Sequence, residues 1–291
     1  MAMYAPVTLL LFPAVWLTTV LLGFSGLFHA FTGDTAGEVL QYSGSALFTL
    51  GFATPDSVAP TVLVYIEAAI GLTLLALLIS YLPSMYGAFS RREISVSRLS
   101  VRAGTPPSAG EMLERAHRAL FFGRLDEVWE EWELWFVELE ETHTSLLILN
   151  FFRSPDPHRS WITAAGTVLD AASLRLSAIE GPPAPAAALC VRSGFIALRA
   201  IAKSFGIAYD LDVSQDTDVS VTRGEFDAVL DRLAAAGVAI KSDRDASWRD
   251  YVGWRANYDT VLLAIAELVV APVAQWSSDR SPVWGSSKRH R

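Results

Sequence analysis

The stretch YSGSALFTLGFATPD, from Tyr42 to Asp56, lies between two long apolar segments and contains no Lys or Arg. Residues 6–31 before it are almost wholly apolar, and a second apolar run follows it over Thr61–Tyr81. At about 1.5 Å per residue, roughly 25 helical residues cover the hydrocarbon core of a bilayer, which is about 30 Å thick. The sequence therefore predicts two transmembrane helices, over about 6–31 and 61–83, with an irregular segment between them.

Lys and Arg occur only after residue 90. The first of them form a cluster directly behind the second apolar run: Arg91, Arg92, Arg98 and Arg102. The positive-inside rule then places the residues after 90 in the cytoplasm, and two spans place the N-terminus there too. A cleaved signal peptide is the alternative for the first apolar run, but it typically has a basic n-region and a shorter apolar stretch. We expect an integral protein of a bacterial-type plasma membrane, in contact with the lipid bilayer and with both termini cytoplasmic.

The composition agrees with a membrane protein. Of 291 residues, 52% are hydrophobic, and the mean hydropathy of +0.32 is high for a soluble protein. The single cysteine, Cys190, excludes an internal disulfide and fits a reducing compartment. A net charge of −8, without a basic stripe interleaved with aromatic residues, argues against a nucleic-acid partner.

Between the two spans, Thr35 and Glu38 have the spacing of a capping box, which predicts a short helix over about 36–48. Thr49–Pro55 then contains Gly and Pro at a density that no regular element accepts. Irregular backbone at membrane depth is tolerated only where protein buries it or where it lines water, because unsatisfied N–H and C=O groups cost several kcal/mol each in lipid. The segment is therefore either an ordinary outer loop or a pore loop.

The segment Thr49-Leu50-Gly51-Phe52-Ala53, placed after a short helix and before an apolar span, resembles the Thr-Val-Gly-Tyr-Gly selectivity filter of potassium channels. Residues 5–90 as a whole resemble the two-transmembrane pore module of that family. The resemblance implies a homotetramer in which filter carbonyls bind potassium or sodium as the permeant ion, with the Thr49 hydroxyl as the innermost ring. It implies no other cofactor and no enzymatic activity.

The filter departs from the family pattern at Ala53, which occupies the position of the second glycine. If alternate filter residues adopt left-handed backbone conformations, an alanine there costs roughly 1–2 kcal/mol per chain. We therefore expect an outer filter that is wider or less ordered, inner sites retained at Thr49 and Leu50, and weaker discrimination against sodium.

Three further residues are pore or gating candidates: Ser45, Glu67 and Gly71. An acid within a span is a functional hypothesis by default, but Glu67 can equally pack behind the loop, bonded to Tyr65 or to a hydroxyl of the short helix. Gly71 can be the flexible point of the inner helix or a site of close helix packing.

After the second span, residues 91–107 are expected to form a linker and residues 108–291 an all-helical cytoplasmic domain, which makes the fold class all-α. Capping boxes at Ser108–Glu111 and Thr222–Glu225 support two of its helices. Helical periodicity predicts helices at about 125–143, 159–179, 187–204, 222–237 and 246–276, the fourth of which begins at the Thr222 cap. The sequence identifies neither a partner nor a gating stimulus for this domain.

Three patterns in this domain were weighed for chemistry. Glu140 and His143 have the spacing of one di-iron motif where two are needed, so an acidic helix end with a solvated histidine is preferred. Four aspartates between 210 and 218 approach calcium-loop spacing, but Gln215 stands where the loop needs Gly and Val221 where it needs Glu. The third pattern comprises Arg153, Ser154, His158 and Arg159. These residues can bind an anion or cap the helix that follows.

Two other classes of function remain as alternatives to a channel. The chain can be a two-span membrane anchor for a cytoplasmic signalling or scaffold domain. A membrane-bound enzyme has no support, because the sequence contains no Ser-His-Asp pattern, P-loop or glycine-rich nucleotide signature.

Overall fold

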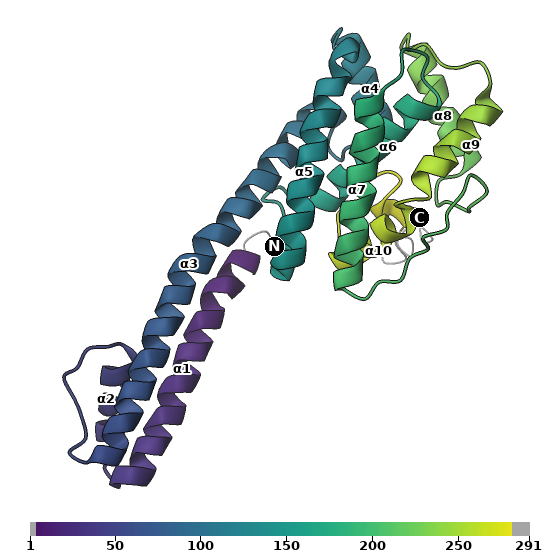
Figure 1. Cartoon of the computed structure of the whole chain (residues 1–291). Helices are drawn as coiled ribbons and strands as arrows, with labels where there is room; N and C mark the ends of the chain where they lie inside the picture. The colour runs from purple at the N-terminus through teal and green to yellow at the C-terminus, as the bar shows by residue number, and fades with distance from the viewer. Residues whose placement is uncertain (1–3, 281–291) are drawn as a thin grey trace, which may run out of the picture. The chain divides into compact units, whose positions relative to one another are not determined.

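The computed structural model describes residues 4–280, and within the first helix it places the side chains of Leu11 and of the residues from Pro13 onward. The described chain is all-helical, as expected, and its only β-type pairing is an isolated antiparallel bridge between Ile179 and Ile240. The last eleven residues of the predicted cytoplasmic domain, 281–291, lie outside the described residues. Figure 1 shows the ten α-helices in chain order: α1 (Tyr4–Thr32), α2 (Ala36–Leu47), α3 (Val58–Ala103), α4 (Ala109–Arg118), α5 (Leu125–Ser145), α6 (Trp161–Ser177), α7 (Pro185–Ser204), α8 (Arg223–Ala235), α9 (Arg244–Arg255) and α10 (Asp259–Leu268).

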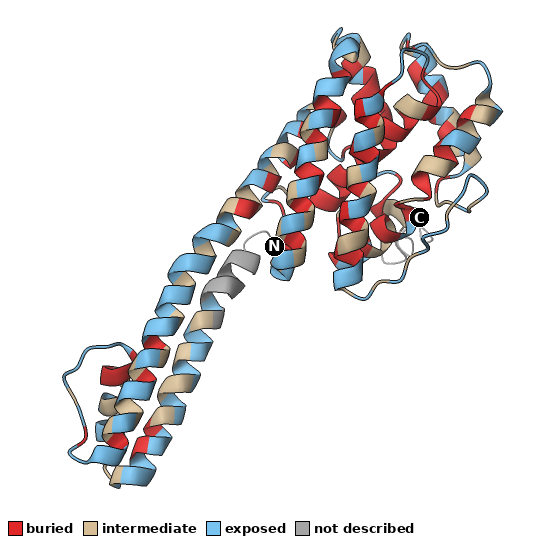
Figure 2. Ribbon diagram, viewed as in Figure 1, coloured by how far each residue is buried: buried red, intermediate tan, exposed pale blue. Residues whose placement is uncertain are grey.

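The chain divides into two compact units, one up to Gly87 and one from Ala88 onward. The first unit contains α1, α2 and most of α3, and the second contains the end of α3 and the helices from α4 to α10. Figure 2 shows mostly exposed and intermediate residues along α1 and the first part of α3, whereas buried residues gather in the second unit. An apolar helix with an exposed surface is what a bilayer-spanning segment requires.

Three of the described helices are long and apolar enough to cross a membrane: α1, α3 and α7. The first two correspond to the predicted spans. A span over α7 was not predicted, and half of the most apolar stretch of this helix is buried within the second unit. Its small and aliphatic side chains contribute to the core of that unit, where Ala187, Cys190 and Leu198 are fully buried.

The prediction of a linker over residues 91–107 was wrong for most of its length. Helix α3 continues without interruption to Ala103, and only a short turn separates it from α4. Val96, Leu99 and Ala103 recur at helical spacing and are buried in the core of the second unit. This apolar face stabilises the extension of the helix, although polar residues alternate with it in the sequence.

Two of the three predicted capping boxes are confirmed in full. In each, the threonine backbone N–H donates to the glutamate three residues later, at 2.9 Å for Thr35–Glu38 and for Thr222–Glu225. At α4 the Ser108 hydroxyl accepts the Glu111 N–H at 3.3 Å, but the Glu111 carboxylate binds Arg115 and Arg232 instead of completing the box.

The predicted helix over 246–276 is two helices, α9 and α10, separated at residues 256–258. The break follows from side-chain contacts at its two sides. Asn257 donates its amide to the Gly253 carbonyl at 2.9 Å, and the buried Tyr258 hydroxyl donates to Asp170 of α6 at 2.9 Å. The turn therefore brings a tyrosine hydroxyl into the core.

A fully buried arginine, Arg255, connects the last third of the chain to α6. Its Nη1 donates to Asp170 and its Nε to Asp259, both at 2.6 Å, while Nη2 donates to the Trp276 carbonyl at 2.6 Å. Its side chain is 0% exposed. Because a buried charge is tolerated only when it is paired and hydrogen-bonded, this network fixes where α9, α10 and the following segment pack.

We predict that Arg255→Met destabilises the protein by about 3–5 kcal/mol, because it leaves buried carboxylates without their counter-charge. Urea unfolding of the full-length chain in nanodiscs, followed by tryptophan fluorescence, measures the change. The matched control is Arg192→Met on an exposed position of α7, which should shift stability by no more than about 0.5 kcal/mol. Equal stability of the two variants would contradict a structural role for Arg255.

Candidate functional site

The candidate site is the loop that follows α2 in the first unit. The α2 helix carries two buried serines, Ser43 and Ser45, on the side that faces the rest of the unit. Each of them makes side-chain hydrogen bonds to residues outside α2. Because hydroxyls on a short helix can replace water as hydrogen-bond partners, they can hold polar groups in an apolar setting.

Ser43 links α2 to both long helices of the unit. Its hydroxyl lies 2.9 Å from the Leu21 carbonyl of α1 and 2.5 Å from Oε1 of Glu67 on α3. Glu67 is 0% exposed, and its Oε2 has no hydrogen-bond partner within the described range. Of the two interpretations of Glu67, the structure therefore agrees with packing behind the loop, against a hydroxyl of the short helix and not against Tyr65.

Gly71 on α3 is explained by close packing. A Cβ at this position would lie 2.0 Å from the Leu47 carbonyl oxygen at the end of α2. Only a glycine therefore allows the end of α2 to approach α3 so closely. Helix α3 is continuous through Gly71. The close approach of α2 to α3 at this residue therefore fixes where the loop after α2 begins.

Ser45 holds the loop itself. Its backbone carbonyl accepts N–H groups from Leu50 at 2.8 Å and from Gly51 at 3.3 Å. Its side-chain Oγ accepts the Ala53 N–H at 3.1 Å. Three N–H groups of the loop thus converge on one buried residue.

The carbonyl groups of the same loop are arranged differently. Within residues 4–280, the carbonyl oxygens from Leu47 to Thr54 accept no hydrogen bond from the chain, and those of Thr49–Phe52 are among them. The side chains of Leu50 and Phe52 are 62% and 67% exposed. Since unpaired carbonyls between two apolar helices need an external partner, these carbonyl groups are suited to bind water, a cation or a donor from another chain.

The backbone conformation of the loop corrects the expectation for Ala53. The left-handed residues here are Thr49, with φ of +53°, and Gly51, with φ of +70°, and the described backbone has no positive φ at Ala53. Ala53 therefore does not carry the strain of a left-handed alanine, and its N–H is bound to Ser45. The wider outer filter and the weaker discrimination against sodium stay predictions. A left-handed β-branched residue is unusual, so the cost of roughly 1–2 kcal/mol belongs to Thr49.

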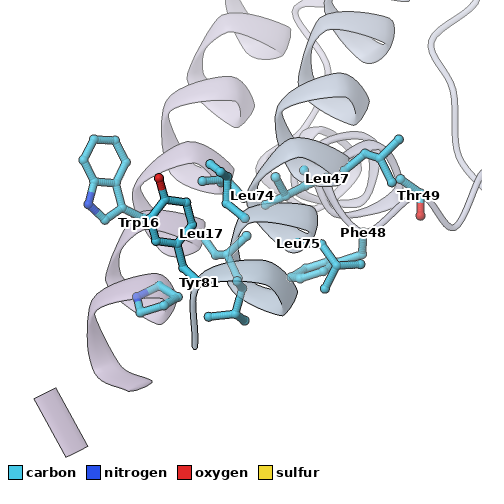
Figure 3. A pocket seen from close by; sticks show the side chains of 13 residues that line it. Trp16, Leu17, Leu47, Phe48, Thr49, Leu74, Leu75 and Tyr81 are labelled. Atoms are coloured by element: carbon cyan, nitrogen blue, oxygen red, sulfur yellow. The ribbon is translucent and has the colours of Figure 1, made fainter. Parts of the chain in front are cut away.

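An apolar groove of about 740 Å³ runs beside the loop within the first unit. Figure 3 shows Trp16 and Tyr81 toward one end of it, and Phe48 and Thr49 toward the other. Leucines of α1 and α3 form much of its wall, and its lining residues are uncharged. The groove therefore accepts apolar groups and places the Thr49 hydroxyl at its polar end.

In the second unit, the Glu140–His143 pair was misjudged. His143 is buried, at 1% exposure, and is not a solvated residue at a helix end. Its Nε2 lies 3.0 Å from Nη1 of Arg92, and its Nδ1 lies 2.9 Å from the Thr142 hydroxyl. The ring is thus an acceptor for a buried cation, and within residues 4–280 no group of three or more His, Cys, Asp or Glu is placed to hold a metal ion.

The other two patterns lie in loops with local contacts. In the aspartate-rich segment, Asp210 and Ser214 each accept a backbone N–H two residues later, at 2.9 and 3.2 Å, which forms turns. Arg153 donates to the Val270 carbonyl at 3.3 Å, and Arg159 binds the Ser97 hydroxyl at 2.8 Å. These contacts give both segments a structural role.

The chain matches no family model, no curated protein and no solved structure.

We predict that Gly71→Ala displaces the end of α2, because the added methyl group meets a backbone carbonyl that cannot move by itself. Overpacking of this kind costs about 1–3 kcal/mol. The change should lower the thermal stability of the membrane-embedded protein, measured by tryptophan fluorescence in nanodiscs. Gly23→Ala on α1 is the matched control, since an added Cβ there meets nothing within 4 Å. If both variants melt alike, the close approach of α2 to α3 is not required.

We also predict a pH effect from His143. Burial, followed by the charge of Arg92, lowers the pKa of His143 from 6.5 to about 3. Below pH 6.5 the unfolded chain takes up a proton that the folded chain does not, so stability is lost as pH falls. The loss from this group should reach about 1.4 kcal/mol at pH 5.5 relative to pH above about 7.5. The difference between wild type and His143→Gln in urea unfolding isolates it, and an identical pH dependence of the two would contradict a neutral His143.

Proposed function

We propose that the protein is a cation channel, most favourable for potassium, whose ion-binding loop is Thr49–Ala53. The observation that carries the proposal is the different hydrogen bonding of the N–H and carbonyl groups of the loop. Ser45 binds the N–H groups of Leu50, Gly51 and Ala53, whereas the carbonyl oxygens of Thr49–Phe52 accept nothing from the chain within the described range. A row of carbonyl dipoles is the ligand that replaces the hydration shell of a monovalent cation in a selectivity filter.

The electrostatics of the first unit support a cation. Helix α2 ends where the loop begins, and its last carbonyl groups have no partner within the helix. The C-terminus of a helix carries partial negative charge. The sequence before Arg91 has no Lys or Arg, and its acids are Asp34, Glu38, Asp56 and Glu67. A cation near the carbonyls of the loop therefore meets no repelling side chain in this part of the sequence.

The channel requires several copies of the chain. One copy contributes two long helices and a short one to the first unit, which is too few to enclose a pathway. Closed cyclic symmetry places identical loops around an axis, so that carbonyls of each copy form rings. Because residues 5–90 resemble the pore module of two-transmembrane potassium channels, we propose a homotetramer embedded in the lipid bilayer, with the second unit on the cytoplasmic side.

The second unit is proposed to assemble or gate the tetramer. Its support is the continuity of α3, which provides the long apolar helix of the first unit and ends in the core of the second. A change in packing around Val96 and Leu99 would therefore act on the same helix that contacts the end of α2 through Gly71. A membrane anchor for a cytoplasmic domain needs neither the Ser45 contacts nor the glycine.

The proposal is tested by ion flux through purified protein reconstituted in liposomes, followed by single-channel recording. We expect the wild type to conduct potassium, with a reversal potential that follows the potassium gradient. Gly51→Ala should reduce flux at least tenfold, because a Cβ at a φ of +70° strains every copy of the loop.

The matched control for this variant is Gly37→Ala, in the first turn of α2, where an added Cβ meets nothing within 4 Å. It should conduct like the wild type. A wild-type protein that carries no ions, or that is a stable monomer by mass measurement in nanodiscs, would leave the anchor as the better function.

A further inference from the structure

The second unit contains a cavity that the proposed pore does not use. It has a volume of about 370 Å³ and lies between the last turn of α3, helix α4 and the start of α5. Apolar side chains from all three elements line it, among them Val101, Met112, Leu125 and Val128. A volume at the lower end of the roughly 300–1,000 Å³ typical of ligand pockets suits a small organic molecule.

One wall of the cavity carries an arginine without a counter-charge. Across residues 4–280, Arg102 makes no hydrogen bond and no ion pair, and its guanidinium carbon lies 5.4 Å from the centroid of the Phe121 ring. Burial, followed by the charge of Arg98, lowers the pKa of Arg102. The guanidinium is thus partly desolvated and held against an aromatic face while its donors remain available.

The carboxylates around this region are already engaged by other arginines. Glu131 accepts from Arg98, and Glu127 accepts from Arg124 at 2.7 Å. On α4, Glu111 binds both Arg115 and Arg232. Within residues 4–280, the charge of Arg102 therefore has no carboxylate partner at this apolar cavity.

The second arginine that lines the cavity, Arg115, is bonded within the chain. Arg115 donates to the Val101 carbonyl at 2.7 Å and to Glu111 at 2.9 Å, so its donors and its charge are occupied within the chain. It closes the cavity between α3 and α4. Among the described residues, Arg102 is thus the cation at the cavity that has no acceptor, and the ligand that complements it carries one negative charge.

We propose that this cavity binds a small organic monocarboxylate with an apolar tail. The carboxylate pairs with the guanidinium of Arg102, and the tail packs against Met112, Leu125 and Val128. A planar guanidinium matches a carboxylate in a two-pronged hydrogen-bonded pair, and the apolar wall removes the tail from water. The site does not depend on whether the first unit conducts ions.

The experiment is calorimetric titration of the full-length protein in nanodiscs with phenylbutyrate, with empty nanodiscs as the blank. We expect saturable binding of one ligand per chain. Phenylbutyramide, which has the same shape without the charge, should bind at least tenfold more weakly. Saturation by the amide at the same concentrations, or no saturable binding of the carboxylate, would overturn the proposal.

Variants locate the site. Arg102→Gln should weaken phenylbutyrate binding at least tenfold with an unchanged circular dichroism spectrum, and Arg102→Lys should retain part of the affinity because it keeps the charge without the planar fork. Arg249→Gln, which removes the same charge at an exposed position of α9, is the control and should bind like the wild type. If Arg102→Gln binds as tightly as the control, the ligand does not use this cavity.

Discussion

Three N–H groups of an irregular loop converge on one buried serine, and the first unit is organised around this constraint. A loop between apolar helices must satisfy its backbone polar groups within the protein or with an external partner. Ser45 provides the internal partner for the N–H groups of Leu50, Gly51 and Ala53. The carbonyl side is left for the external partner. The function that we propose follows from this division, because a cation is a partner that carbonyl oxygens can bind and N–H groups cannot.

The position of the loop depends on the contacts of α2 with its two neighbours. Ser43 reaches the Leu21 carbonyl on one side and Glu67 on the other, and the Leu47 carbonyl approaches Gly71 of α3. A short helix with one buried face has little stability of its own, so these contacts hold it in place. The buried acid and the glycine, which both had a gating interpretation, are thereby accounted for as supports of the loop.

The four arginines at the end of α3 make different contacts in the second unit. In the sequence, four arginines after residue 90 form one cluster that indicates topology. In the structure, Arg91 and Arg98 make ion pairs with acids of α5, and Arg92 is buried against carbonyls of Leu149 and Phe152. Arg102 alone of the four has no acceptor within residues 4–280 and borders a cavity. Helical spacing decides this, because each position of α3 faces a different neighbour.

The sequence by itself determined the two long apolar helices, the short helix between them and the helical nature of the remainder, because hydropathy and capping residues act locally. The Gly and Pro content of Thr49–Pro55 likewise marked this segment as irregular. Only the tertiary structure decided that α3 extends to Ala103, that His143 is buried beside Arg92, and that Thr49 rather than Ala53 is left-handed. These features depend on partners distant in the chain, which determine whether a polar side chain meets water, a carbonyl or a charge, and no local pattern records them.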